Sequence, residues 1–318
     1  MSAMESLAAD NRPWAFIRRL LARVGLSGRG LVVAAPMLWL VIFFLIPFAV
    51  VLKIALSVPM IAQPPYSPLT EWTNDGELIV KLNFGNFQFL MGDPLYINAY
   101  LSSLKIAAIS TVLTLLVGYP MAYFIARSSE RWRNLMLMLI ILPFWTSFLL
   151  RVYAWIGFLK ANGVINNFLM SIGIIHEPLV MLQTDFAVYL GIVYTYLPFM
   201  ILPLYANLVK LDDSLLEASA DLGGRPLTTF FNITLPLSMP GIIAGSMLVF
   251  IPAVGEFVIP ALLGGANTLM IGRVLWDEFF SNRDWPFAST VAIAMLALLV
   301  VPIMFMRRVQ DRITEDSA

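Results

Sequence analysis

The sequence contains no cysteine and only one histidine, His176, in 318 residues. These absences exclude disulfide bonds and argue against an enzyme built on a thiol, a zinc ion or a histidine pair. A phosphate-binding loop of the form G-x-x-x-x-G-K-[ST] is also missing. We therefore expect no catalytic, metal-binding or cofactor-binding residue in this chain.

Charge is scarce as well. Charged residues make up 13% of the chain and the formal net charge is zero, whereas 59% of the residues are hydrophobic and the mean hydropathy is +0.82. Basic residues dominate no large segment, which argues against nucleic acid as a partner. The composition is that of an integral membrane protein.

Long apolar runs are abundant. A helix needs about 20 apolar residues to cross the hydrocarbon core of a bilayer. The sequence predicts an all-α protein with six transmembrane helices, at residues 31–52, 106–126, 134–150, 186–209, 237–255 and 285–306. The fifth run continues through Glu256 to Leu263. Residues 152–159 either extend the third helix or form a separate interfacial helix.

Basic residues predict the orientation of these spans, because cytoplasmic loops carry the excess of Lys and Arg. Thirteen of the 20 Lys and Arg residues lie in the two terminal segments and in the loops at 127–133 and 207–240. Both termini are therefore expected in the cytoplasm. The predicted organisation is a basic segment at 1–30, a transmembrane domain at 31–306 and a cytoplasmic tail at 307–318. The first segment reads either as an amphipathic helix on the inner leaflet or as a disordered tail.

The predicted external side has the longer connections, above all residues 57–98. Proline, glycine and aromatic residues in this segment indicate an ordered cap rather than a flexible linker. We expect it to offer a docking surface for another protein.

The 207–240 loop contains the ordered stretch "DDSLLEASADLGGRPLTTFFNITLPL". Ser214 and Glu217 have the spacing of a capping box, which marks the start of a helix running through Leu222. Gly223 and Gly224 supply a left-handed turn that ends this helix. Residue 226 is a proline suited to open a second short helix, which would end before the proline at 236. The loop is predicted to be a helix, a turn and a helix.

Helices of about eight residues are unstable alone in water, so this pair needs a surface to pack against. The loop has apolar residues for that contact at Leu215, Leu216, Leu222, Phe230 and Phe231. Two partners remain open from the residues alone. The helices either pack on their own membrane domain or dock on a separate protein.

The same stretch carries a family resemblance. Glu217-Ala218-Ser219, followed at fixed spacing by Gly223, Ile233 and Leu235-Pro236, resembles the EAA signature of permease subunits in bacterial ABC importers. One position departs from the signature, because Ser219 stands where alanine is usual. "FIPAVGEFVIPALLGG" and "MIGRVLWDEFF" are similar to the polyamine branch, with the first permease subunit of putrescine importers as the nearest match.

The resemblance implies a type I importer permease of the bacterial inner membrane. Its loop would insert into a cleft on a separate ATPase, which would bind the ATP. The implied partners are two copies of that ATPase, a second homologous permease, a periplasmic substrate-binding protein and membrane lipid. The implied substrate is a polyamine, putrescine first, with spermidine or another small solute as the alternative.

A solute path needs polar or aromatic side chains inside the membrane, and an ionisable residue within a span is a functional candidate. The candidates are Glu256, Trp145, Tyr194 and Tyr196. A carboxylate among aromatic faces suits a flexible diamine. Glu256 could instead pair with Arg151 or cap an interrupted helix, and ordinary packing explains the aromatic residues. Prolines at 252 and 260 flank Glu256, so the helix is expected to open locally there.

Two other classes of function stay open. A secondary transporter would need coupling-ion sites and usually an internal repeat, whereas this chain has one deep carboxylate and no detectable repeat. A membrane scaffold would use the loop only to recruit a soluble protein.

Overall fold

The computed structural model describes residues 28–72 and 77–315 of the chain. The predicted basic segment at 1–30 falls outside these ranges up to residue 27. The chain divides into two units, one up to Ile54 and one from Ala55 onward.

The first unit is helical throughout its described part. It comprises α3 (Gly28–Leu40), a π-helical turn (Val41–Leu45) and α4, which runs from Ile46 to Ala55. The side chains of Leu38, Trp39 and Phe43 are exposed. The stretch between Arg29 and Lys53 is apolar and uncharged, which suits contact with lipid.

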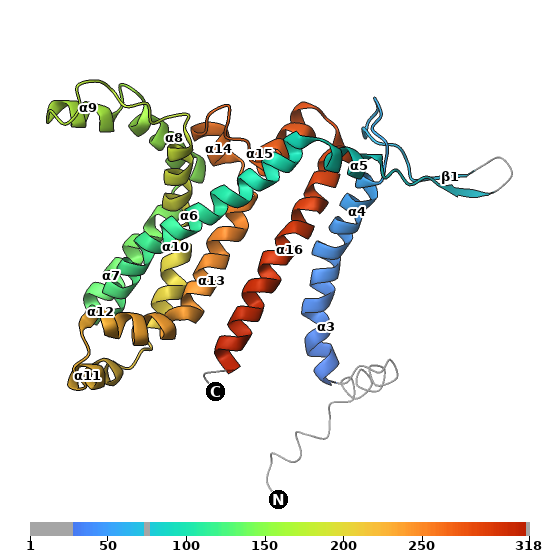
Figure 1. Ribbon diagram of the computed structural model, residues 1–318. Coiled ribbons are helices and arrows are strands. Elements are labelled where there is room, and N and C mark those ends of the chain that lie inside the picture. The colour runs from blue at the N-terminus through green and yellow to red at the C-terminus, as the bar shows by residue number, and fades with distance from the viewer. Residues whose placement is uncertain (1–27, 73–76, 316–318) are drawn as a thin grey trace, which may run out of the picture. The chain divides into compact units, whose positions relative to one another are not determined.

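The second unit contains a β-hairpin and a set of helices (Figure 1). The elements are β1 (Thr70–Trp72), β2 (Leu78–Val80), α5 (Gly85–Gly92), α6 (Pro94–Arg127), α7 (Glu130–Ile141), a 3-10 turn (Leu142–Trp145), α8 (Phe148–Leu159), α9 (Val164–Ser171), α10 (Asp185–Leu208), α11 (Asp213–Asp221), α12 (Pro226–Thr229), a π-helical turn (Phe230–Thr234), α13 (Leu235–Val254), α14 (Val258–Leu263), α15 (Ile271–Trp276), η4 (Asp277–Ser281, π-helical) and α16 (Trp285–Glu315).

The centre of this unit is the packing of α6, α10 and α13 against one another. Small residues let the backbones approach, as is typical of helices that pack within a membrane. A Cβ atom at Gly245 would lie 2.8 Å from the Met200 sulfur, and one at Gly241 would lie 2.9 Å from the Asn207 Cβ atom. Buried residues such as Ile201 and Leu204 fill the contact between the helices.

Six helical stretches in residues 28–72 and 77–315 are long and apolar enough to cross a membrane. They are Val32–Ala55, Pro94–Arg127, Phe148–Ser171, Asp185–Leu208, Pro226–Val254 and Trp285–Met304. The predicted number of spans is confirmed. The second span is longer than predicted, because its helix already begins at Pro94, where Asp93 accepts a hydrogen bond from the Leu95 N–H at 2.8 Å.

The third span differs most from the sequence prediction. Residues 134–150 do not form one helix, because α7 ends at Ile141 and a 3-10 turn containing Pro143 follows. The chain then restarts as α8, which includes Arg151 and continues to Leu159. Proline lacks the N–H that a continuous helix would need at this point. The candidate span is therefore Phe148–Ser171 rather than the predicted run.

The long connection before α6 is ordered in its described residues, as predicted. The strands β1 and β2 pair antiparallel, with Glu71 opposite Ile79. The Asn86 side chain donates hydrogen bonds to the Ala55 and Ser57 carbonyls, both at 3.0 Å. This hairpin is the exception to an otherwise helical fold among the described residues.

The end of the chain also departs from the prediction. Helix α16 continues to Glu315, so the backbone of residues 307–315, predicted as a tail, prolongs the sixth helix. Residues 316–318 lie outside the described part.

Candidate functional site

The 207–240 loop contains the predicted helix, turn and helix, but its first helix is capped differently. Asp212, rather than Ser214, is the N-cap residue, and its carboxylate accepts a hydrogen bond from the Ser214 N–H at 3.0 Å. The predicted capping box of Ser214 and Glu217 is therefore wrong, because Asp212, two residues earlier, caps the helix by accepting from the Ser214 N–H. Hydrogen bonds from the Ser214 N–H and hydroxyl lower the pKa of Asp212.

The turn after α11 is the one that the two glycines predict. Gly223 has a φ of +80°, the left-handed conformation. The Gly223 N–H donates to the Ala220 carbonyl at 2.9 Å, and the Gly224 N–H donates to the Ser219 carbonyl at 2.8 Å. This pair of bonds is a Schellman motif. Gly224 is needed for a different reason, namely the close approach of its backbone to α11. A Cβ atom at this position would lie 2.7 Å from the Ser219 carbonyl oxygen.

Ser219, the position that departs from the EAA signature, links the two short helices. Its hydroxyl shares a hydrogen bond of 2.7 Å with the Thr229 hydroxyl at the end of α12. Alanine could not form this bond. The Ser219 hydroxyl therefore has a structural role in this chain, because it ties α11 to α12.

The second short helix does not end before Pro236, as the sequence suggested. Pro226 opens α12 as predicted, but the chain then passes through the π-helical turn directly into α13. Pro236 lies in the first turn of α13, directly after this π-helical turn. The loop is thus continuous with the fifth span.

Three contacts hold the loop on the membrane-spanning helices. Arg127 at the end of α6 forms an ion pair with Asp213 at the start of α11. The Tyr119 ring meets the Phe230 ring edge to face at 5.6 Å, and the Tyr119 and Ser238 hydroxyls share a hydrogen bond of 2.9 Å. The loop is therefore braced by α6, and it continues directly into α13.

Other apolar residues of the loop point away from that support. Leu222 is 90% exposed and Leu227 is 73% exposed, and Leu215 and Phe231 are also exposed. The loop therefore packs on its own chain through Phe230 and also presents apolar side chains outward, so docking on a separate protein stays a prediction.

The remaining residues of the signature occupy distinct places. Glu217 and Ala218 are exposed on α11, and Pro236 is exposed on α13. Ile233 is half-buried, and Leu235 packs on the cluster around Ile201 and Leu204.

Glu256 occupies the break between α13 and α14. Its side chain is buried, with 8% of its surface exposed. One carboxylate oxygen accepts hydrogen bonds from the Val258 N–H at 3.0 Å and the Ile259 N–H at 3.4 Å. The other oxygen accepts a hydrogen bond from the Tyr196 hydroxyl at 2.6 Å. The predicted local opening is confirmed, and of the alternatives for this carboxylate the helix cap is the one observed.

The other predicted path residues do not join this cluster. The Tyr194 ring contacts the Trp155 ring edge to face at 5.4 Å, and Trp145 is 86% exposed at the end of the 3-10 turn. The Arg151 guanidinium lies over the Phe144 ring at 5.4 Å rather than pairing with Glu256. Of the four candidates, the structure brings Glu256 and Tyr196 together.

Sequence reasoning missed Arg127, Thr229 and Tyr119 as parts of the loop's support. Arg127 lies 86 positions before its partner Asp213, and Tyr119 lies 111 positions before its partner Phe230. Such long-range pairs have no local sequence pattern. Thr229 is ten positions from Ser219. Only Asp212 could have been found from a local pattern, because an aspartate directly before a helix is a typical N-cap residue and Asp212 directly precedes α11.

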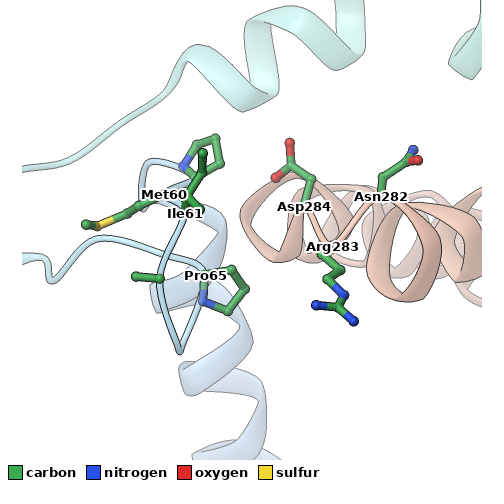
Figure 2. A pocket seen from close by; sticks show the side chains of 8 residues that line it. Met60, Ile61, Pro65, Asn282, Arg283 and Asp284 are labelled. Atoms are coloured by element: carbon green, nitrogen blue, oxygen red, sulfur yellow. The ribbon is translucent and has the colours of Figure 1, made fainter.

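A hollow lies at the other end of the second unit, between the Pro59–Pro65 segment and the start of α16 (Figure 2). Its volume is about 370 Å³. Met60, Ile61 and Pro65 line one side, and Asn282, Arg283 and Asp284 line the other. Arg283 has a φ of +56° and is exposed.

The comparison with protein families decides the classification. Residues 115–315, which include the braced loop, Glu256 and α16, match the family described as binding-protein-dependent transport system inner membrane component. The chain belongs to this family. The family places it in a multi-pass inner membrane system that depends on a binding protein, and the predicted resemblance to importer permeases is confirmed.

Relatives in the family support the predicted branch. The chain is 41% identical over 267 residues to the spermidine/putrescine transport system permease protein PotB of Haemophilus influenzae, covering 83% of this chain and 88% of that protein. It is 44% identical over 229 residues to PotB of Escherichia coli K12, covering 71% of this chain and 83% of that protein. The resemblance to the polyamine branch is thus confirmed.

A solved structure supports the fold of this family member. A chain of a bacterial ABC transporter involved in import of the acidic polysaccharide alginate matches 96% of this chain and 100% of its own length. The TM-score is 0.67 at 19% sequence identity. This likeness concerns the fold alone.

Proposed function

We propose that the chain is a permease subunit of an ATP-driven importer and forms half of the membrane path for a polyamine. Putrescine is the first substrate and spermidine the alternative. The observation that carries the proposal is the 207–240 loop, which is braced on α6, continues into α13 and directs apolar side chains outward. A loop built in this way can transmit a partner's movement to the spans, because the support resists independent motion.

The partner on this loop is a separate ATPase subunit. Exposed Leu222, Leu227 and Phe231 supply the apolar centre of a protein interface, and exposed Glu217 and Asp221 supply its polar rim. Two copies of the ATPase serve two permease subunits, this chain and a homologous one. ATP binds to the ATPase, and a periplasmic binding protein delivers the substrate on the opposite side. Lipid surrounds the assembly.

The substrate proposal rests on the names of the relatives, which are spermidine/putrescine permeases. The deep carboxylate of Glu256 beside Tyr196 agrees with a cationic solute. A flexible diammonium ion gains from both charge pairing and aromatic faces.

ATPase activity of the assembled complex tests this function. We expect substrate-loaded binding protein to stimulate ATP hydrolysis well above the rate seen with no binding protein. A secondary transporter would show no such stimulation and would take up solute with an ion gradient instead. A scaffold would show neither activity.

The predicted topology can be tested with single cysteines, since the chain has none of its own. Ser129, between α6 and α7, and Asn282, just before α16, are both exposed. With both termini cytoplasmic and six crossings, a membrane-impermeant thiol reagent should label Ser129→Cys only after the cells are opened. Asn282→Cys should react in intact cells. Labelling of both positions from the outside would contradict the orientation.

A further inference from the structure

A second hollow, distinct from the one in Figure 2, lies between α8, α14 and α15. Its volume is about 490 Å³, and its lining includes Tyr153, Phe257, Arg273, Trp276 and Asp277. The Phe257 and Trp276 rings stack with centroids 4.4 Å apart and planes 10° apart. We name it the Asp277 hollow. It combines one carboxylate with aromatic side chains, of which the Trp276 ring lies between Phe257 and Phe280, whose centroid is 4.1 Å away.

The Asp277 hollow lies at the far end of α13 from the 207–240 loop. Helix α13 begins next to that loop and ends at Val254, directly before the break that leads to Phe257. Figure 1 shows α8, α14 and α15 at the end of the unit opposite α11 and α12. In the predicted topology this is the external end, where a solute released by a binding protein would enter.

Close backbone packing builds the hollow. A Cβ atom at Gly272 would collide with the Gly255 carbonyl oxygen and would lie 2.8 Å from that of Glu256. Only glycine therefore lets α15 lie against the break, and this approach sets Trp276 beside Phe257. The Glu256 carboxylate holds the other side of the same break through the Val258 N–H.

The side chains of the hollow have room for a ligand. Tyr153 is 57% exposed and Trp276 is 42% exposed, and Asp277 is exposed as well. The exposed Tyr153 ring and the Asp277 carboxylate line the same space and attract an ammonium group through cation–π contact and charge pairing. The apolar ring faces also contact the methylene chain that joins two ammonium groups.

We propose that the Asp277 hollow is an entry site for a polyamine, with the Asp277 carboxylate as counter-ion of one ammonium group and the stacked Phe257 and Trp276 rings as the wall that holds the chain. This inference rests on the proposed function, because it names residues through which that function begins. It adds side chains on α15 and η4 that lie outside the predicted set of path residues.

Arg273 brings a positive charge to the same hollow, so the ammonium group binds on the Asp277 side. The buried Glu256 carboxylate, directly before Phe257 in the chain, does not line the hollow, which thus has one acidic and one basic side chain. A zwitterion that pairs with both Arg273 and Asp277 is the competing ligand, and the test includes one.

The test is equilibrium binding of labelled spermidine and putrescine to the purified complex of permeases and ATPase, without the external binding protein. Asp277→Asn should weaken binding on the order of tenfold, and Asp277→Glu should restore most of it. Trp276→Leu should weaken binding while Trp276→Tyr retains it, because only the tyrosine keeps an aromatic face. Glu177→Gln, an exposed acid in the loop before α10, is the matched control and should bind like the unchanged complex.

Each outcome decides the proposal. Unchanged binding by Asp277→Asn overturns it, as does tighter binding of a neutral amino acid than of spermidine. Absence of polyamine binding to the unchanged complex overturns it as well. ATP-driven uptake by the unchanged complex is measured in parallel. If that complex takes up polyamine while Asp277→Asn binds normally, the entry site fails and the proposed function stands, whereas loss of polyamine uptake by the unchanged complex refutes the function itself.

Discussion

Replacement of Gly223 by valine should reduce ATP-driven uptake at least tenfold while the protein still inserts into the membrane. Gly223 has a φ of +80°. This left-handed conformation costs residues other than glycine roughly 1–2 kcal/mol, and β-branched residues such as valine adopt it least readily. A cost of about 1.4 kcal/mol already changes an equilibrium tenfold. Valine should therefore disrupt the turn that sets α11 against α12. Copurification of the ATPase with the permease and uptake by the complex measure the effect.

The same position offers a matched control. A Cβ atom at Gly223 would meet no other atom within 4 Å, so the effect of valine is conformational rather than steric. Asparagine tolerates the left-handed conformation better than other non-glycine residues. Gly223→Asn should therefore keep most of the ATPase binding and the uptake. Normal copurification and normal uptake by Gly223→Val would refute the assignment of this loop to the ATPase.

Replacement of Glu256 by glutamine should leave assembly intact and impair uptake. The glutamine oxygen can still accept from the Val258 N–H, and its amide can donate to the Tyr196 hydroxyl, so the break between α13 and α14 keeps its hydrogen bonds. The negative charge is lost. At an effective dielectric constant of about 20, an ammonium group roughly 8 Å away loses about 2 kcal/mol of attraction. The substrate concentration for half-maximal uptake should then rise about tenfold or more.

A second substitution separates the charge of Glu256 from its structural role. Glu256→Leu removes the acceptor for both N–H groups and for Tyr196, and a buried unpaired donor costs about 1–3 kcal/mol. We expect less of this variant in the membrane, measured against Glu256→Gln in the same cells. If Glu256→Gln assembles normally and its uptake has unchanged concentration dependence, the carboxylate acts only as a helix cap.

Much of the fold follows from local patterns in the sequence. Apolar run length predicted six spans, and Gly223 and Pro226 predicted the turn and the second helix of the loop, because these residues act on their own backbone. The boundaries were less predictable. Helix α6 begins at Pro94, 12 positions before the start of the predicted span at residue 106. This start was not predictable, because polar residues near a helix end do not show whether the helix has already begun.

The candidate site was predictable only where one residue acts alone. Glu256 is conspicuous as a carboxylate in an apolar run, and the flanking prolines predicted the break around it. Its pairing with Tyr196 joins positions 60 apart in sequence, and the Arg127–Asp213 ion pair joins two loops. Such contacts depend on how α6, α10 and α13 pack, which no local pattern encodes. For the same reason, the sequence singled out the two stretches that line the Asp277 hollow only by family resemblance and did not show that Phe257 and Trp276 meet.

The most direct test of the central claim is uptake into vesicles that contain the complete complex with its binding protein. Labelled putrescine, spermidine and an uncharged solute are compared with and without ATP on the ATPase side. We predict uptake of the polyamines that requires both ATP and the binding protein, with no uptake of the uncharged solute. Uptake of polyamine that proceeds without ATP, or ATP-driven uptake of the uncharged solute but not of either polyamine, would contradict the account.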